Sequence, residues 1–309
     1  MKKALSILTA GCLAVSLAAC GSTAASSAAS AADSTASSAA ESTAASDTAA
    51  ADGQTYKVGI CQLVQHVALD AATQGFKDAL TEQLGDAVTF EEKNAQGDSN
   101  TCSTIINGFV SDNVDLILAN ATPALQAAQA GTNTIPVLGT SVTEYGVALG
   151  IDDFDGLVGT NISGTSDLAP LDEQAGIIKE LFPDAKTVGL LYCSAEPNSQ
   201  YQVDTVKASL EELGYTCEYY AFSDSNDLAT VCQSAADASD VIYVPTDNTV
   251  ANNTEIVNNI CQPAGVPVVA GEEGIMGGCG VATLSISYYD LGVATGKMAA
   301  KILTGESKV

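Results

Sequence analysis

Polar side chains suited to holding a small molecule follow several predicted β-strands of this sequence. His66 comes after the first strand pattern, Ser141 after the fourth and Asp247 after a later one. Small molecules bind beyond the carboxyl ends of the strands in open α/β sheets. The polar side chains at such ends are Gln62, His66, Thr122, Ser141, Asn198, Ser199, Thr246 and Asp247. We expect residues of this set to line one binding site.

The candidate residues offer groups of opposite charge. Predicted helices begin beside Thr122 and Asn198, and the free N–H groups of a helix N-terminus suit a carboxylate. The carboxylate of Asp247 suits an ammonium group. The two features together indicate a zwitterion such as an amino acid. Structural alternatives stay open, because Asp247 could cap the next helix and His66 could be a surface or cap residue.

A small polar segment at residues 161–167 separates two similar series of strand and helix patterns. It contains Gly164, so it can bend, and its side chains can form hydrogen bonds. We predict a hinge strand between two lobes, with a small-molecule cleft over it. Ser166 and Asp167 are therefore further ligand candidates. Their alternative role is to cap a helix predicted over residues 168–181.

Strands alternate with helices on both sides of this segment, which predicts parallel sheets. Thr122 as N-cap and Pro123 at the first helical position are typical of a helix start. The fold class expected is α/β, with two doubly wound Rossmann-like lobes joined by a hinge. The predicted strands span residues 57–61, 87–91, 114–119 and 135–139 before the hinge, and 187–193, 216–222, 241–245 and 266–270 after it.

Composition bounds the classes of function. The chain has 309 residues, enough for about two domains, and 46% of them are hydrophobic, enough for sizeable cores. A formal net charge of −26 argues against a nucleic-acid partner, because phosphate binding needs clustered basic residues. The simplest role of this acidity is solubility.

The N-terminus has the pattern of a signal peptide over residues 1–19. Lys2 and Lys3 precede an apolar stretch, residues 4–17, which is shorter than the roughly 20 residues that a membrane-spanning helix needs. The sequence LAAC ending at Cys20 resembles a bacterial lipoprotein lipobox, which implies cleavage before Cys20 and lipidation of its sulfur. The alternative is a secreted protein cut nearby. Residues 20–54 then form a Ser/Ala/Thr tether, which we expect to be disordered.

Several segments together resemble one family, the ABC-transporter substrate-binding lipoproteins of the tryptophan/tyrosine type. Each segment alone is a weak signal, but jointly they are specific, and the similarity extends from Tyr56 to the end of the sequence. The segments are QHVALD at 65–70, NAQGD at 94–98, ATPA at 121–124, GTSD at 164–167, GLLY at 189–192 with NS at 198–199, PTDNTV at 245–250 and YYDLG at 288–292.

The resemblance implies a type I periplasmic-binding-protein fold with three crossings between its lobes. The N-terminal lobe would comprise residues 55–162 plus 288–309, with a helix at 290–303 packed on it, and the C-terminal lobe residues 163–287. The implied protein is a non-enzymatic monomer on the extracytoplasmic face of a bacterial membrane. It would bind an aromatic or hydrophobic amino acid and deliver it to an ABC permease. Related chains continue past the position of Val309, so either this sequence is truncated or the last crossing is incomplete.

The sequence lacks the motifs of several other classes of function. The sequence has no G-x-S-x-G elbow, Walker A loop or G-x-G-x-x-G after the first strand, so we expect no enzyme and no cofactor. A single histidine excludes a multi-histidine metal site. A receptor for a nucleoside or sugar is the closest rival. Cysteines after Cys20 show no zinc spacing, and we expect mostly free, buried thiols, with a disulfide as the open alternative.

Overall fold

The structure is a computed structural model that describes residues 53–309. The expectations for the signal peptide, for Cys20 and for most of the tether lie outside these residues. In the described part of the chain, no helix has the length and apolar character needed to cross a membrane. The described residues form two α/β lobes, each built on its own parallel sheet.

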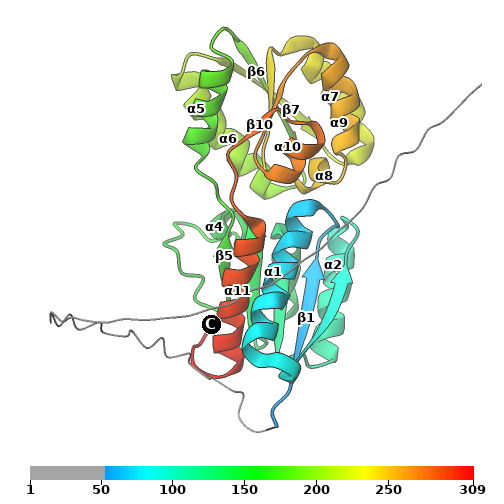
Figure 1. Cartoon of the computed structure of the whole chain (residues 1–309), viewed down its shortest axis with the longest axis vertical. Helices are drawn as coiled ribbons and strands as arrows, with labels where there is room; N and C mark the ends of the chain where they lie inside the picture. The colour runs from blue at the N-terminus through cyan, green and yellow to red at the C-terminus, as the bar shows by residue number, and fades with distance from the viewer. Residues whose placement is uncertain (1–52) are drawn as a thin grey trace, which may run out of the picture. The chain divides into compact units, whose positions relative to one another are not determined.

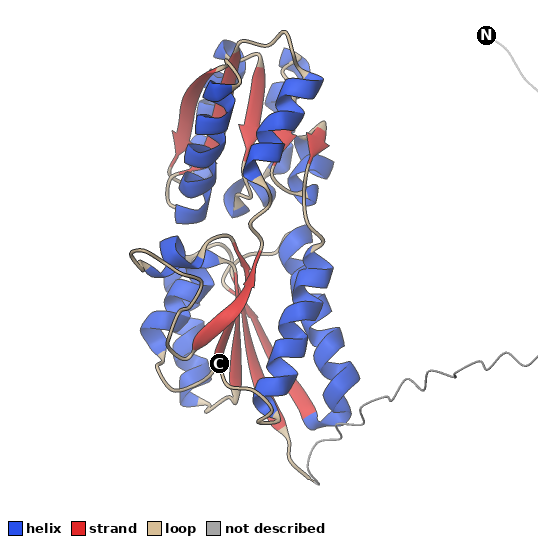
Figure 2. Ribbon diagram, turned by 90° about the vertical axis from the view of Figure 1, so that its left-hand side faces the viewer, coloured by secondary structure: helices blue, strands red, loops and turns tan. Residues whose placement is uncertain are grey.

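The first lobe contains a five-stranded parallel sheet in the order β2-β1-β3-β4-β5. Helices lie on both sides of this sheet (Figure 2), so its central strands are buried along their whole length. The strands are β1 (Tyr56–Gln62), β2 (Val88–Asn94), β3 (Leu116–Asn120), β4 (Val137–Val142) and β5 (Ile162–Ser166). The helices are α1 (Val67–Leu84), η1 (Gly85–Ala87), α2 (Ser99–Ser111), α3 (Thr122–Gly131) and α4 (Tyr145–Leu149).

The second lobe repeats this plan with a five-stranded sheet in the order β10-β9-β8-β6-β7. All of its strand pairs are parallel. The strands are β6 (Thr187–Cys193), β7 (Thr216–Phe222), β8 (Val241–Val244), β9 (Val268–Ala270) and β10 (Ala282–Thr283). The helices are α5 (Leu171–Leu181), α6 (Pro197–Glu212), α7 (Ser225–Ala238), α8 (Asn248–Ala251), α9 (Thr254–Ala264) and α10 (Glu273–Cys279).

Two segments cross between the lobes in the described residues, one after β5 and one after β10. The second leads into α11 (Tyr288–Leu303), which returns to the first lobe and lies along α1 (Figure 1). Small residues allow this close approach: a Cβ added at Gly292 would lie 2.0 Å from the carbonyl oxygen of Ala72. The expected packing of residues 290–303 on the first lobe is therefore confirmed.

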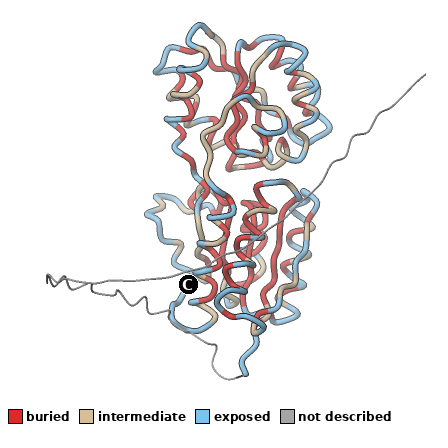
Figure 3. Tube along the Cα trace, in the orientation of Figure 1, coloured by how far each residue is buried: buried red, intermediate tan, exposed pale blue. Residues whose placement is uncertain are grey.

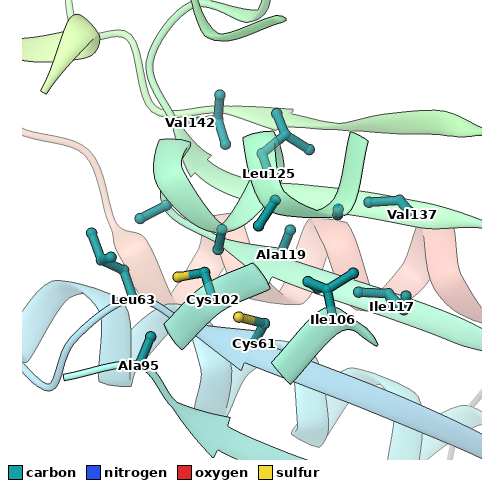
Figure 4. Packing of buried hydrophobic residues seen from close by; sticks show 14 of the residues in the cluster. Cys61, Leu63, Ala95, Cys102, Ile106, Ile117, Ala119, Leu125, Val137 and Val142 are labelled. Carbon is teal, nitrogen blue, oxygen red and sulfur yellow. The ribbon is translucent and has the colours of Figure 1, made fainter. Parts of the chain in front are cut away.

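Apolar side chains fill both faces of each sheet. Buried residues follow the strands and the inner faces of the helices in both lobes (Figure 3). In the first lobe, the side chains of Cys61 of β1 and Cys102 of α2 lie beside each other inside this core (Figure 4). All seven described cysteines are free, and six are buried, as the sequence led us to expect.

Several predicted boundaries were wrong by a few residues. The N-cap of α3 is Ala121, so Thr122 and Pro123 lie one position further into the helix than predicted. Helix α5 begins at Leu171, after Pro170, and not at residue 168. The first sheet also extends past the expected lobe boundary at residue 162, because β5 pairs with β4 as far as Ser166.

Candidate functional site

A narrow cavity lies where the carboxyl ends of strands from both lobes meet. Its volume is about 10 Å³, room for one water molecule or one ammonium group. First-lobe residues and the first crossing line one side of it, and second-lobe residues line the other. The side chains that matter below are His66, Ser141, Asp167, Asn198, Asp247 and Asn248.

Unpaired polar atoms concentrate in this cavity. Among the described residues, seven buried side-chain nitrogen or oxygen atoms have no hydrogen-bond partner, and four of them belong to cavity-lining residues. Buried polar groups are normally paired, since each unpaired one costs about 1–3 kcal/mol. The four atoms are His66 Nδ1, Ser141 Oγ, Asp167 Oδ1 and Asn198 Oδ1. Their gathering in one space indicates a ligand that completes their hydrogen bonds.

The contacts of His66 define what its free nitrogen can do. Asn248 donates from Nδ2 to Oε2 of Glu196 at 2.7 Å, so Oδ1 of Asn248 is an acceptor. His66 Nε2 lies 3.2 Å from this oxygen and must carry the hydrogen. Burial lowers the pKa of His66, which favours the neutral ring. Its Nδ1 therefore presents a lone pair to the cavity.

Asn198 presents a second acceptor by the same reasoning. Its Nδ2 donates to the carbonyl oxygen of Thr246 at 3.1 Å, which leaves Oδ1 as the unpaired atom. Asn198 lies in the first turn of α6, where Pro197 occupies a position that needs no backbone donor. The helix start thus fixes the backbone of Asn198 at the cavity.

Asp167 supplies a third acceptor and joins the two crossings. Its Oδ2 accepts a hydrogen bond of 2.9 Å from the hydroxyl of Tyr288, the first residue of α11, while Oδ1 has no partner. Burial raises the pKa of Asp167, with partial compensation from the hydrogen bond of Tyr288. A cation beside Oδ1 would restore the ionised form.

The other carboxylates that line the cavity are already occupied by backbone N–H groups. Asp247 accepts from the backbone N–H of Cys193 at 2.7 Å through Oδ2 and from that of Val250 at 2.9 Å through Oδ1. Burial, with the nearby charge of Glu196, raises the pKa of Asp247 to about 7. Glu272 likewise accepts from the N–H groups at the start of α10. Asp167 is thus the one cavity-lining carboxylate, within residues 53–309, that retains an unpaired buried oxygen.

Ser141 is held at the cavity by an irregular strand end. Its φ of 54° lies in the left-handed region, which non-glycine residues rarely adopt, and the register of β4 against β5 shifts between Gly139 and Val142. Irregularities of this kind re-aim side chains beside binding sites, and backbone strain of about 1–3 kcal/mol is retained where the surroundings enforce it. The result is a buried hydroxyl directed into the cavity.

The structure brings together only part of the predicted set. His66, Ser141, Asp167, Asn198, Thr246 and Asp247 line the cavity. Gln62 does not, because its amide is used within the first lobe by Val64, Asp70 and Thr73. Thr122 and Ser199 are buried outside it, and the hydroxyl of Ser166 bonds to the backbone of Thr143 and Leu168.

Sequence reasoning missed four polar residues at the cavity. Thr143 and Glu272 follow strand ends, and Asn248 is adjacent to Asp247, so their positions carried the same signal as the predicted residues. Tyr288 gave no such signal, because it begins a helix distant in sequence from the hinge segment.

A second hollow of about 210 Å³ adjoins the cavity, and Asn248 lines both. Apolar side chains of the first lobe form part of its wall, including Leu63, Val64 and Pro123. Glu196 and Asn253 are among the second-lobe residues that face them. The contact of His66 with Asn248 lies at the junction of the two spaces.

Comparison with known proteins gives one consistent set of relatives. Residues 57–308 match the family described as ABC transporter substrate binding protein. A tyrosine-binding protein of Clostridioides difficile (strain R20291) is 36% identical over 253 residues, covering 81% of this chain and 73% of the relative.

Two solved structures of relatives differ in ligand state. A domain from Streptococcus pneumoniae in complex with L-tryptophan is 34% identical, with a TM-score of 0.79. The ligand-free, open structure of a substrate-binding protein with adhesive properties from Clostridium difficile is 40% identical, with a TM-score of 0.60. Both alignments cover 82% of this chain and 86% of the other. The backbone thus superposes better on the tryptophan complex, although that relative is less similar in sequence.

Proposed function

Since this chain belongs to the family of ABC transporter substrate binding proteins, we propose that it captures an aromatic or other hydrophobic amino acid between its two lobes. The fold is that of the type I periplasmic binding proteins, two parallel-sheet α/β lobes in one chain. The relatives named above are a tyrosine-binding protein and a tryptophan complex, which supports the ligand class.

The observation that carries the proposal is the set of unpaired acceptors in the cavity. A primary ammonium group has three N–H donors, and the cavity offers His66 Nδ1, Asp167 Oδ1 and Asn198 Oδ1. These atoms come from the first lobe, the first crossing and the second lobe. An ammonium group held by all three would favour the closed arrangement over the open one, as ligand-driven closure requires.

The amine-binding carboxylate in this proposal is Asp167. We expected Asp247 in that role, but both of its oxygens accept backbone hydrogen bonds. Asp247 then contributes negative charge to the cavity wall without a direct bond to the ligand. The sequence contains no arginine and no lysine lines the cavity, so the ligand carboxylate would be held by neutral donors such as the hydroxyl of Ser141.

The ligand side chain requires more room than the cavity gives. An aromatic ring cannot enter a space of about 10 Å³, whereas the adjoining hollow of about 210 Å³ has apolar residues on its first-lobe wall. In the proposed complex the ring occupies that hollow, and the contact of His66 with Asn248 opens to connect the two spaces. Entry of the ligand proceeds by rotation of the lobes about their crossings.

The remaining parts of the proposal concern the setting of the protein. Lipidation at Cys20, after removal of residues 1–19, would anchor the monomer outside the cell membrane, and residues 20–54 would tether the lobes. The closed form would deliver its ligand to an ABC permease, with no chemical step and no cofactor. Mass analysis of the protein from membranes tests the anchor, because lipidation adds two or three acyl chains at Cys20.

A thermal-shift series tests the ligand. A ligand at 100 times its Kd stabilises the folded state by about 2.7 kcal/mol, which corresponds to a rise in Tm of roughly 5–10 °C for a chain of this size. We expect this shift with L-tryptophan or L-tyrosine, and none with N-acetyl-L-tryptophan, which lacks the ammonium group. Shifts with nucleosides or sugars and none with any amino acid would refute the proposal in favour of its rival.

A further inference from the structure

A pair of thiols lies in the core of the second lobe, and neither cysteine lines the ligand cavity. Cys232 on α7 and Cys261 on α9 have their sulfur atoms 3.6 Å apart, and both are reduced. The two helices pack against each other, so the pair links neighbouring elements. A disulfide needs sulfur atoms about 2.05 Å apart, so oxidation of this pair requires the two sulfur atoms to move about 1.5 Å closer.

An open groove on the second lobe leads to one member of this pair. The groove has a volume of about 720 Å³, and its lining includes Leu181, Pro183, Asp240 and Cys261. Cys261 is the one described cysteine in that lining, whereas Cys232 is fully buried behind it. An incoming reagent would therefore meet Cys261 first.

The helix end that carries Cys261 lacks one backbone hydrogen bond. Pro263 lies inside α9, where proline has no N–H to donate, while the backbone N–H of the C-cap Gly265 bonds to the carbonyl oxygen of Cys261. Because only 2% of Cys261 is exposed, its reaction requires a local opening of this last turn. The missing hydrogen bond lowers the free energy of that opening.

The two thiols are also unequal in acidity. The hydrogen bond between the two thiols, in which either sulfur can be the donor, lowers the pKa of Cys261 and raises that of Cys232. The thiolate is the reactive form of cysteine in exchange with disulfides. Cys261 is thus the nucleophile, and Cys232 is the second thiol.

We propose that Cys261 and Cys232 form a redox-reactive dithiol site that is oxidised by small organic disulfides entering the groove. The Cys261 thiolate attacks one sulfur of the organic disulfide, forming a mixed disulfide and releasing one small thiol. The sulfur of Cys232 then attacks Sγ of Cys261, forming the Cys232–Cys261 bond and releasing the second small thiol. The two protons of the protein thiols leave on the released thiols, so one protein disulfide replaces one organic disulfide.

The first lobe contains a natural control for this proposal. Cys61 and Cys102 also form a buried pair of neighbouring thiols (Figure 4), but neither lines the groove. Both lie in the apolar core between β1 and α2. If pairing of thiols alone decided reactivity, the two pairs would react alike.

The test treats the full, reduced chain with glutathione disulfide and maps the cysteines by peptide mass spectrometry without reduction. We expect a peptide pair linked through Cys232 and Cys261, formed about tenfold or more faster than any link between Cys61 and Cys102. The Cys232→Ser variant should hold one glutathione on Cys261, since the second thiol is missing. The Cys261→Ser variant should give neither the link nor a glutathione on Cys232.

The opposite results are equally definite. Oxidation of Cys61 with Cys102 at the same rate would show that the groove has no role. Modification of Cys232 in the Cys261→Ser variant would overturn Cys261 as the first nucleophile, and a Cys261–Cys279 link in the unmodified chain would overturn Cys232 as the second thiol. Reduced Cys232 and Cys261 after prolonged treatment of the folded chain would overturn the proposal itself. Cys102→Ser serves as the matched variant, and we expect it to leave the Cys232–Cys261 reaction unchanged.

Discussion

Replacing Asp167 with asparagine tests the proposed ammonium site with little change in shape. Asparagine can still accept the hydrogen bond that the Tyr288 hydroxyl donates to Oδ2. Its amide nitrogen then occupies the place of Oδ1 and directs N–H donors into the cavity, where the proposed ligand also has donors. The variant therefore removes the charge and reverses the direction of one hydrogen bond.

The expected loss follows from the burial of this carboxylate. Removing one member of a buried, hydrogen-bonded charge pair costs about 2–5 kcal/mol in binding. The acceptors of His66 and Asn198 remain in Asp167→Asn, so the lower part of that range applies. A loss of about 2–3 kcal/mol corresponds to a Kd for L-tryptophan that is roughly 30- to 150-fold weaker.

Without ligand, the Asp167→Asn variant should be at least as stable as the unmodified protein. The pKa of Asp167 is raised in the folded state, so its contribution to stability is greatest at low pH and is lost as pH rises through the folded pKa. Asparagine does not titrate, and at pH 7 we expect Asp167→Asn to have the same or a higher Tm without ligand. A variant that binds weakly but melts no earlier cannot be dismissed as misfolded.

Titration calorimetry with L-tryptophan, paired with thermal melts, measures both quantities. The matched control is Asp172→Asn on the exposed first turn of α5, which should leave the affinity and Tm unchanged. If Asp167→Asn binds L-tryptophan within about threefold of the unmodified protein, Asp167 does not contact the ammonium group and the reasoning fails.

Two further predictions concern pH and packing. Burial raises the pKa of Asp247 to about 7, and a bound ammonium group favours the ionised carboxylates, so the affinity for the ligand should fall as pH drops below about 7. Calorimetry in buffers of different ionisation enthalpy should then detect proton release on binding. Identical affinity at pH 5 and pH 8 would contradict this expectation. In urea titrations, Gly292→Ala should destabilise the fold by about 1–3 kcal/mol, since the added methyl group meets the backbone of α1. Gly176→Ala, which has open space around the added methyl group, should instead stabilise the fold by about 0.5–1 kcal/mol. Equal effects of the two substitutions would refute the argument for close packing of α11 on α1.

Much of the fold follows from local patterns that act over a few residues. The strands at residues 187–193 and 216–222 were predicted with the observed boundaries, because polar turns flank each apolar run. Helix starts were less predictable. The positive φ of Ala121 makes it the N-cap of α3, a conformation that the sequence does not signal for alanine. Pro170 similarly delays α5, although residues before it had suggested an earlier start.

The sequence predicted the location of the candidate site but not the hydrogen bonds within it. His66 and Asn198, which we predicted from their positions at strand ends, both line the cavity, since parallel strands bring their carboxyl ends to one edge. Which carboxylate keeps a free oxygen depends on distant partners. Asp247 is satisfied by Cys193, and Asp167 is oriented by Tyr288, and neither pairing has a local signal in the sequence. Long-range hydrogen bonds therefore decide the chemistry that residue types leave open.

The position of α11 has a consequence for how the protein matures. Residues 171–283 contain the whole second lobe in one stretch, whereas the first lobe is complete only once Tyr288–Leu303 has been made. A chain synthesised from its N-terminus thus completes its second lobe first, and the side of α1 that will contact α11 stays exposed to solvent until the end of synthesis. Chains arrested at residue 287 should accordingly resist protease in the second lobe and be cut in the first lobe. A chaperone that binds exposed apolar surfaces of nascent chains would bind this face of α1.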